Sequence, residues 1–141
     1  MRHNAIRDLE AELLREVCKD VKVEPELLPI GNLELHGNTA DKVRLDVSAV
    51  GVWSPMERTF VDVRIMHPNS PSYRDKPPDK LYLQHEREKK NMYNDRVLQV
   101  EKGSFSPLIY STTGGMGVEC TKYHKRIAEL IALKRNENSA C

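Results

Sequence analysis

The chain has 141 residues, of which 39% are hydrophobic and 30% are charged, and its formal net charge is +1. This length fits one domain that buries about two-thirds of the surface its unfolded chain exposes. The near-neutral charge does not favour nonspecific binding to nucleic acid, although it leaves room for a local basic face.

Cysteine spacing and hydropathy argue against several classes of protein. The three cysteines are widely separated and form no Cys-x-x-Cys pair, which argues against a zinc site and against a disulfide framework. No apolar run approaches the length of a membrane span, and the amino terminus lacks the apolar segment of a signal peptide. We therefore expect no membrane partner and a nuclear or cytoplasmic location.

Hydrophobic periodicity and the positions of glycine and proline predict the secondary structure. The predicted elements are a helix over 4–18, a strand over 21–24, a loop over 28–41, strands over 44–53 and 58–66, a proline-rich connection over 67–79, a helix over 80–97, a strand over 105–110, a glycine-rich turn over 111–117 and a helix over 118–134.

Local signals refine these elements. Asn4 is expected to cap the first helix and Asp79 the second, because short polar side chains accept hydrogen bonds from free helical N–H groups. Trp53, the only tryptophan, is expected in the core. We expect a single domain over 1–135 and a flexible tail over 136–141.

The predicted order of elements is α-β-β-β-α-β-α. A hairpin followed by a helix and a returning strand favours an α/β fold with a mixed sheet and helices on its faces. The sequence therefore predicts an α/β domain.

Two acids occur in the predicted hairpin. Asp46 and Asp62 lie in its first and second strands, and Arg64 follows Asp62 by two residues. Because side chains alternate along a strand, Asp62 and Arg64 share one face, and the hairpin places Asp46 opposite or diagonal to Asp62. Two carboxylates at such a short distance repel each other unless one is protonated or a cation lies between them. Bound Mg²⁺ would satisfy them and would suit phosphodiester hydrolysis. The simpler alternative is two exposed acids beside a surface salt bridge.

A second group of polar residues lies on the predicted helix over 80–97. His85, Lys89 and Tyr93 follow one another at intervals of four residues and therefore share a face. This stripe either faces the phosphate of a substrate or is simply exposed, with Glu86 and Lys90 forming an ion pair beside it. The turn at Thr112–Gly117 lacks the lysine of a phosphate-binding loop, and glycines in a tight strand-to-helix turn explain it.

The acid pair followed by Asp-x-basic resembles the PD-(D/E)xK nuclease superfamily, with Leu45 in place of the usual proline and Arg64 in place of the usual lysine. Further segments, in order, resemble the restriction-like endonuclease domain found downstream of the reverse transcriptase in non-LTR retrotransposons. These segments are Arg2-His3-Asn4, Val23-Glu24-Pro25, Lys89-x-x-x-Tyr93 and Phe105-Ser-Pro-Leu-Ile-Tyr-Ser-Thr-Thr-Gly-Gly-Met-Gly117.

The resemblance implies a restriction-endonuclease-like core and a role for each group. Asp46 and Asp62 would bind Mg²⁺, or Mn²⁺ as its substitute, with Glu24 as a third carboxylate. Lys89 would replace the missing lysine from the next helix, as in other members where that group has migrated. Arg64 would hold a phosphate oxygen, since its planar fork suits bidentate contact but it cannot act as a base at neutral pH.

The remaining candidates implied by the resemblance contact DNA or phosphate, and Glu12 is a further acid on the first helix. The residues expected to contact DNA or phosphate are Arg2, His3, His85, Lys90 and Tyr93.

The resemblance implies a metal-dependent DNA endonuclease that nicks target DNA for retroelement integration, leaving a 3′ hydroxyl for priming. DNA would be its substrate, and an upstream reverse transcriptase or zinc-finger domain would be its partner. Two alternatives remain open at this stage. One is a module that binds nucleic acid but has lost efficient catalysis, and the other is a structural or interaction domain of a reverse-transcriptase-associated protein.

Overall fold

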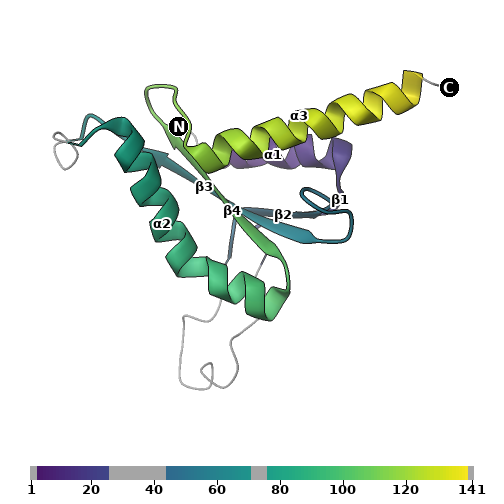
Figure 1. Cartoon of the computed structure of the whole chain (residues 1–141), viewed down its shortest axis with the longest axis horizontal. Coiled ribbons are helices and arrows are strands. Elements are labelled where there is room, and N and C mark those ends of the chain that lie inside the picture. Colours follow the sequence, from purple (N-terminus) through teal and green to yellow (C-terminus); the bar gives the residue numbers. More distant parts are fainter. Residues whose placement is uncertain (1–2, 26–43, 71–75, 140–141) are drawn as a thin grey trace.

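The computed structural model describes residues 3–25, 44–70 and 76–139. The described elements are α1 (His3–Val17), β1 (Lys19–Val23), β2 (Val47–Val50), β3 (Arg58–Met66), α2 (Pro78–Arg96), the π-helical turn η4 (Val97–Glu101), β4 (Ser104–Ser111) and α3 (Val118–Ser139). The predicted α/β class and order of elements are confirmed (Figure 1). The predicted loop over 28–41 lies outside the described residues.

The four strands form one mixed sheet in the order β1-β2-β3-β4. β2 pairs antiparallel with β3, with Val47 opposite Val61 and Val50 opposite Arg58, which confirms the predicted hairpin. β3 and β4 are parallel, and α2 connects them, as parallel neighbours require a crossover. Among the described residues, no helix is long and apolar enough to cross a membrane.

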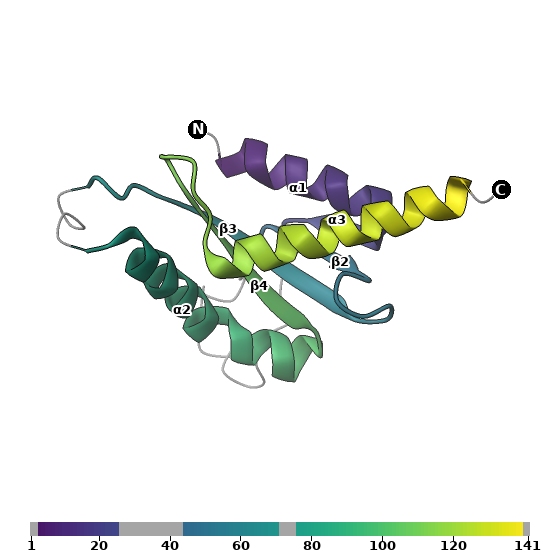
Figure 2. The same ribbon diagram turned by 45° about the horizontal axis from the view of Figure 1, so that its top comes forward.

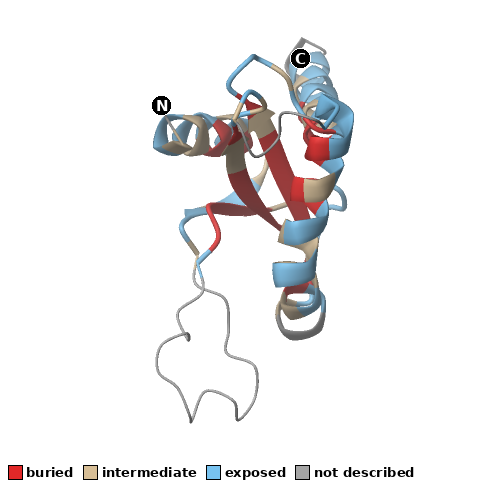
Figure 3. Cartoon of the chain, turned by 90° about the vertical axis from the view of Figure 1, so that its left-hand side faces the viewer, coloured by how far each residue is buried: buried red, intermediate tan, exposed pale blue. Residues whose placement is uncertain are grey.

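The sheet lies between two helical layers. Helices α1 and α3 cover one face and α2 covers the other (Figure 2). Because side chains alternate along β3, Val61 and Val63 pack toward α1 and α3, whereas Phe60 and Met66 belong to clusters on the α2 side. Burial follows this layering, since the central strands are buried and the outer helical surfaces are exposed (Figure 3).

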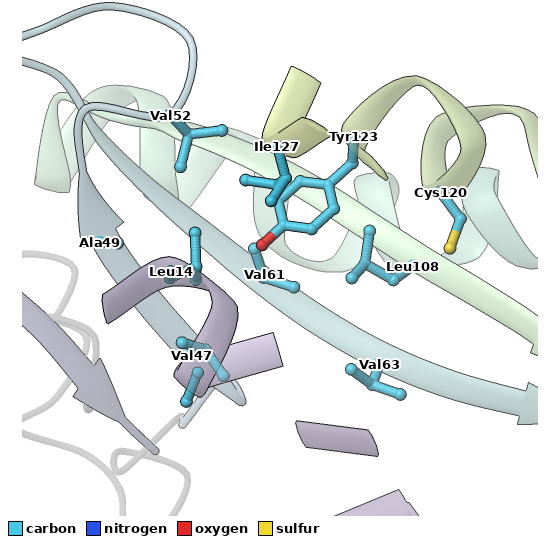
Figure 4. Close-up of a cluster of buried hydrophobic side chains, with 11 residues drawn as sticks. Leu14, Val47, Ala49, Val52, Val61, Val63, Leu108, Cys120, Tyr123 and Ile127 are labelled. Atoms are coloured by element: carbon cyan, nitrogen blue, oxygen red, sulfur yellow. The ribbon is translucent and has the colours of Figure 1, made fainter. Parts of the chain in front are cut away.

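The larger core cluster lies between the sheet and the α1–α3 pair. Leu14 of α1, Leu108 of β4 and Tyr123 of α3 meet there, and all three are fully buried (Figure 4). Truncating a buried leucine of this kind to alanine costs about 2–5 kcal/mol, because transfer energy is lost and a cavity remains. This cluster holds β3 and β4 rigid beneath the polar residues described below.

The helix ends differ from those predicted. Asn4 lies inside the first turn of α1, so its predicted capping role is wrong. α2 begins after Pro77 with no side-chain cap, and Asp79 lies in its first turn, where an acid favours the helix dipole without capping. α3 continues to Ser139, past the predicted end at residue 134. The prediction that Trp53 lies in the core is also wrong, because this residue is 38% exposed.

The start of α3 is capped from another helix. The buried carboxylate of Glu86 in α2 accepts a hydrogen bond from the N–H of Glu119 at 2.8 Å. Gly117, immediately before α3, has no room for a Cβ, which would lie 2.6 Å from Glu86 Oε2. Close packing of α2 therefore explains a glycine in this turn, and the φ of +98° at Gly114 explains another.

Candidate functional site

Asp46 lies directly before β2, where β3 extends beyond its neighbour. Its N–H donates to the carbonyl of Val61 at 3.1 Å, and its Oδ2 accepts from the N–H of Val63 at 2.6 Å. The Asp46 side chain thus accepts a hydrogen bond from the N–H of Val63, a residue of β3 that lies beyond the part of β3 paired with β2. This contact fixes the carboxylate against β3.

The hairpin register ends with Val47 opposite Val61, and Asp46 and Asp62 are the next residues along the two segments, consistent with the predicted opposite or diagonal placement. Asp46 and Asp62 are only 8% and 7% exposed, and Asp46 is close enough to act on the pKa of Asp62. The alternative of two exposed acids is therefore wrong. Burial, followed by the neighbouring Asp46 carboxyl group, raises the pKa of Asp62 to about 6, although the charge of Lys89 acts to lower it.

Lys89 approaches the acid pair from α2. Its Nζ lies 2.5 Å from Asp62 Oδ2, and only 17% of the lysine side chain is exposed. The same nitrogen lies 5.7 Å from the centre of the Tyr93 ring. The ring packs in turn against Phe105 of β4, which holds this part of α2 on the sheet. The structure thus brings the lysine implied by the resemblance to the second acid.

His3 approaches from the start of α1. Its Nε2 lies 3.1 Å from Asp46 Oδ2. Burial lowers the pKa of His3, but the hydrogen bond to Asn4 and the charges of Asp46 and Asp62 outweigh it, so the net shift is upward. His3 also lines a cavity of about 470 Å³ between α1 and the ends of β3 and β4. The site thus combines two acids with two basic groups from three segments of the chain and both helical layers.

Two predicted site residues lie near the pair, but their side chains form ion pairs with other residues. The backbone N–H of Glu24 donates to the carbonyl of Asp46 at 2.7 Å, but the Glu24 carboxylate pairs with Arg7 at 3.1 Å. Arg64 shares the face of Asp62, yet its guanidinium pairs with Glu88 at 3.0 Å.

The stripe predicted on α2 faces the sheet, so the alternative that it is simply exposed is wrong. His85 is buried, and its pKa is lowered first by that burial and then by the charge of Arg64. Lys90 pairs with Glu119 of α3 at 2.9 Å and not with Glu86. Of the stripe, Lys89 alone contacts the acids, and the predicted phosphate contact Arg2 lies outside the described residues.

The acid pair is the best candidate for a metal site in the described part of the chain. No group of three or more His, Cys, Asp or Glu residues in that part is close enough to hold a metal ion. Two carboxylates nevertheless fit Mg²⁺, which is commonly bound through one or two carboxylates while water and substrate phosphate complete its coordination. Asp46 and Asp62 are therefore the residues that would hold it, and Glu24 does not join them.

The sequence reasoning missed a second buried polar group, on the other face of the sheet. Glu10 of α1 is 2% exposed, and its Oε2 accepts from the Tyr110 hydroxyl at 2.5 Å and contacts His124 Nε2 at 2.7 Å. Hydrogen bonds to Cys120 and Glu10 raise the pKa of His124 to about 10, although burial acts to lower it. Glu12, the acid considered on this helix, is exposed.

Comparison with known proteins adds no assignment. No protein-family model matches the chain, and no curated protein matches it significantly.

Proposed function

We propose that this chain is a Mg²⁺-dependent DNA endonuclease with a restriction-endonuclease-like core. The observation that carries the proposal is the contact of Lys89 with Asp62, at 2.5 Å, beside the buried carboxylate of Asp46. Two acids and one lysine, from a hairpin and from the following helix, are the combination that the PD-(D/E)xK resemblance implies. The α-β-β-β-α-β-α order supports the same fold.

The burial of this group supports a functional role. Taking charged groups out of water costs several kcal/mol each, and a well-packed apolar group at the same place is often no less stable. Asp62 and Lys89 nevertheless occupy a protected position, with their side chains 9% and 17% exposed. Ionisable groups with perturbed pKa values, close together, are typical of catalytic sites.

Each residue has a defined task in the proposed reaction. Asp46 and Asp62 hold the cation, which when bound polarises a phosphate oxygen and makes a bound water more acidic. Lys89 orients the attacking water beside Asp62 and stabilises the negative charge that develops on the phosphate. His3 holds Asp46 in place and supplies a second donor near the same charge. Arg64 contacts neither acid, so we assign it to phosphate binding outside the reacting centre.

In its parent element, the proposed enzyme would nick target DNA and leave a 3′ hydroxyl from which a reverse transcriptase primes synthesis. This role comes from the resemblance to the retrotransposon endonuclease domain.

A nicking assay tests the proposal. Supercoiled plasmid would be incubated with the wild type, with Asp62→Asn and with Asp79→Asn, in Mg²⁺, in Mn²⁺ and in EDTA. Asp79 is an exposed acid in the first turn of α2, so its substitution removes the same charge away from the site. We expect metal-dependent nicking by the wild type and the control, and a loss of at least ~100-fold in Asp62→Asn. Equal nicking by all three proteins, or none by a folded wild type, would overturn the proposal.

A further inference from the structure

A groove runs along the outer side of α2. Its volume is about 660 Å³, and its polar lining comes from one stretch of chain that begins just before the helix. The polar residues that line it are Lys76, Lys80, Gln84, Arg87, Glu88 and Asn91.

The charge of this groove is predominantly positive. Lys76, Lys80 and Arg87 contribute three cations, whereas Glu88 is the one acid in the lining and already pairs with Arg64 at 3.0 Å. Lys80 and Arg87 form no ion pair with any residue that the structure describes, and both are exposed. Two cations therefore remain available for an anionic ligand.

The helix that forms the groove also connects to the proposed reacting centre. Arg64, which pairs with Glu88 in the groove wall, follows Asp62 by two residues on the same face of β3. Lys89, the next residue after Glu88, contacts Asp62 itself. Lys80 and Arg87 lie on the exposed side of α2, about half a helical turn from Lys89, so an anion in the groove would be bound on the outer side of the helix.

The opposite flank of α2 is already occupied by protein contacts. There Glu86 accepts the N–H of Glu119, and Lys90 pairs with the Glu119 carboxylate. The α2 residues first expected to contact DNA therefore serve the packing of the domain, which leaves the groove as the cationic flank that faces solvent.

We propose that this groove binds the phosphate backbone of nucleic acid along the outer side of α2. Lysine and arginine side chains, with amides such as those of Gln84 and Asn91, are common phosphate contacts. Such contacts position the backbone and carry no sequence information, so binding is independent of sequence and strongly dependent on salt. The inference rests on the proposed function only for the claim that the bound strand is also the substrate.

The test is a binding measurement without metal, which separates it from cleavage. The double variant Lys80→Glu/Arg87→Glu would be compared with Lys125→Glu/Arg135→Glu. The latter makes the same change in net charge at exposed positions of α3. Affinity for a labelled duplex of arbitrary sequence would be measured in EDTA over a series of KCl concentrations, and circular dichroism would establish that all proteins are folded.

We expect the groove variant to bind at least ~10-fold more weakly at about 100 mM KCl. The slope of log affinity against log salt should fall in magnitude by about two, because each lost phosphate contact removes ~0.9. The α3 variant should retain most of the wild-type affinity and slope. Equal weakening in both variants, or no DNA binding by the wild type, would overturn the groove assignment. Intact groove-dependent binding without metal-dependent nicking would leave the groove assignment standing and contradict the proposed nuclease.

Discussion

The ammonium nitrogen of Lys89 lies 2.5 Å from Asp62 Oδ2, so α2 places a positive charge on an acid pair built by the hairpin of β2 and β3. Without that charge, the structure would hold two neighbouring carboxyl groups in a protected site with His3 as their remaining cationic partner. The contact between Lys89 and Asp62 therefore affects both the stability of the domain and the proposed phosphodiester hydrolysis.

Replacing Lys89 with methionine should therefore destabilise the metal-free protein at neutral pH. The change leaves Asp62 buried without its ion-pair partner, which costs about 3 kcal/mol at sites of this kind. Lys89→Arg keeps the charge and should lose less. Urea unfolding in EDTA measures both effects. If Lys89→Met were as stable as the wild type, the ammonium group of Lys89 would not be compensating the charge of the buried Asp62 carboxylate.

Two tyrosines allow a hydroxyl group without a hydrogen-bond partner to be compared with one that has a partner. The Tyr123 hydroxyl has no hydrogen-bond partner in the described part of the chain, whereas the Tyr110 hydroxyl donates to Glu10 at 2.5 Å. A buried, unsatisfied hydroxyl costs about 1–3 kcal/mol. Tyr123→Phe should therefore raise the free energy of unfolding by ~1 kcal/mol.

Tyr110→Phe should instead lower the free energy of unfolding by about 1–3 kcal/mol, because it removes a donor from the buried Glu10 carboxylate. Denaturant unfolding of the two variants side by side tests the pair. The same sign of change in both would contradict this description of the two hydroxyl groups.

The contact between His124 and Glu10 should make stability depend on pH in the alkaline range. In the folded state the pKa of His124 is raised to about 10, against about 6.5 in an unfolded chain. The folded state thus binds the proton more tightly, so its contribution is complete below pH ~6.5 and is lost as pH rises toward ~10.

Comparing the wild type with His124→Gln isolates this contribution. The difference in free energy of unfolding should be largest near pH 6 and should fall by on the order of 2 kcal/mol by pH 10. Urea denaturation at pH 6, 8 and 10 measures it. A difference that stays constant with pH would show that the imidazole is not held in its charged form.

The parts of the structure that depend on local spacing were predictable from the sequence. Alternation along β3 and the short turn before it placed Asp46 opposite or diagonal to Asp62, and helical spacing made Lys89 part of an ordered stripe. Each of these relationships joins residues within one hairpin or one helix. The identification of Lys89 as the group that meets Asp62 needed the family resemblance in addition.

The orientation of side chains at element ends and between distant elements was not predictable. Glu24 has a φ of +54° at the end of β1, and its carboxylate pairs with Arg7, 17 residues away. Lys90 meets Glu119, which lies 29 residues later and is brought near only by the packing of α2 against α3. No local pattern contains these contacts.

Glu10 was missed although a signal existed. It lies four residues after Ile6 and four before Leu14, within the apolar stripe of α1, where an acid is unexpected. A charged residue at a core position indicates a buried partner, and that partner, His124, is 114 residues away.

The central claim is that Lys89 and the acid pair form one metal-dependent hydrolytic centre, and the rate of plasmid nicking as a function of Mg²⁺ concentration tests it most directly. Wild type, Lys89→Met and Lys90→Met would be compared at a temperature where all three are folded. Lys90 is the matched control, because it is the adjacent lysine and pairs with α3. The account predicts saturable Mg²⁺ dependence for the wild type and Lys90→Met, and a rate at least ~100-fold lower for Lys89→Met at saturating Mg²⁺. Equal rates for Lys89→Met and the wild type would contradict it.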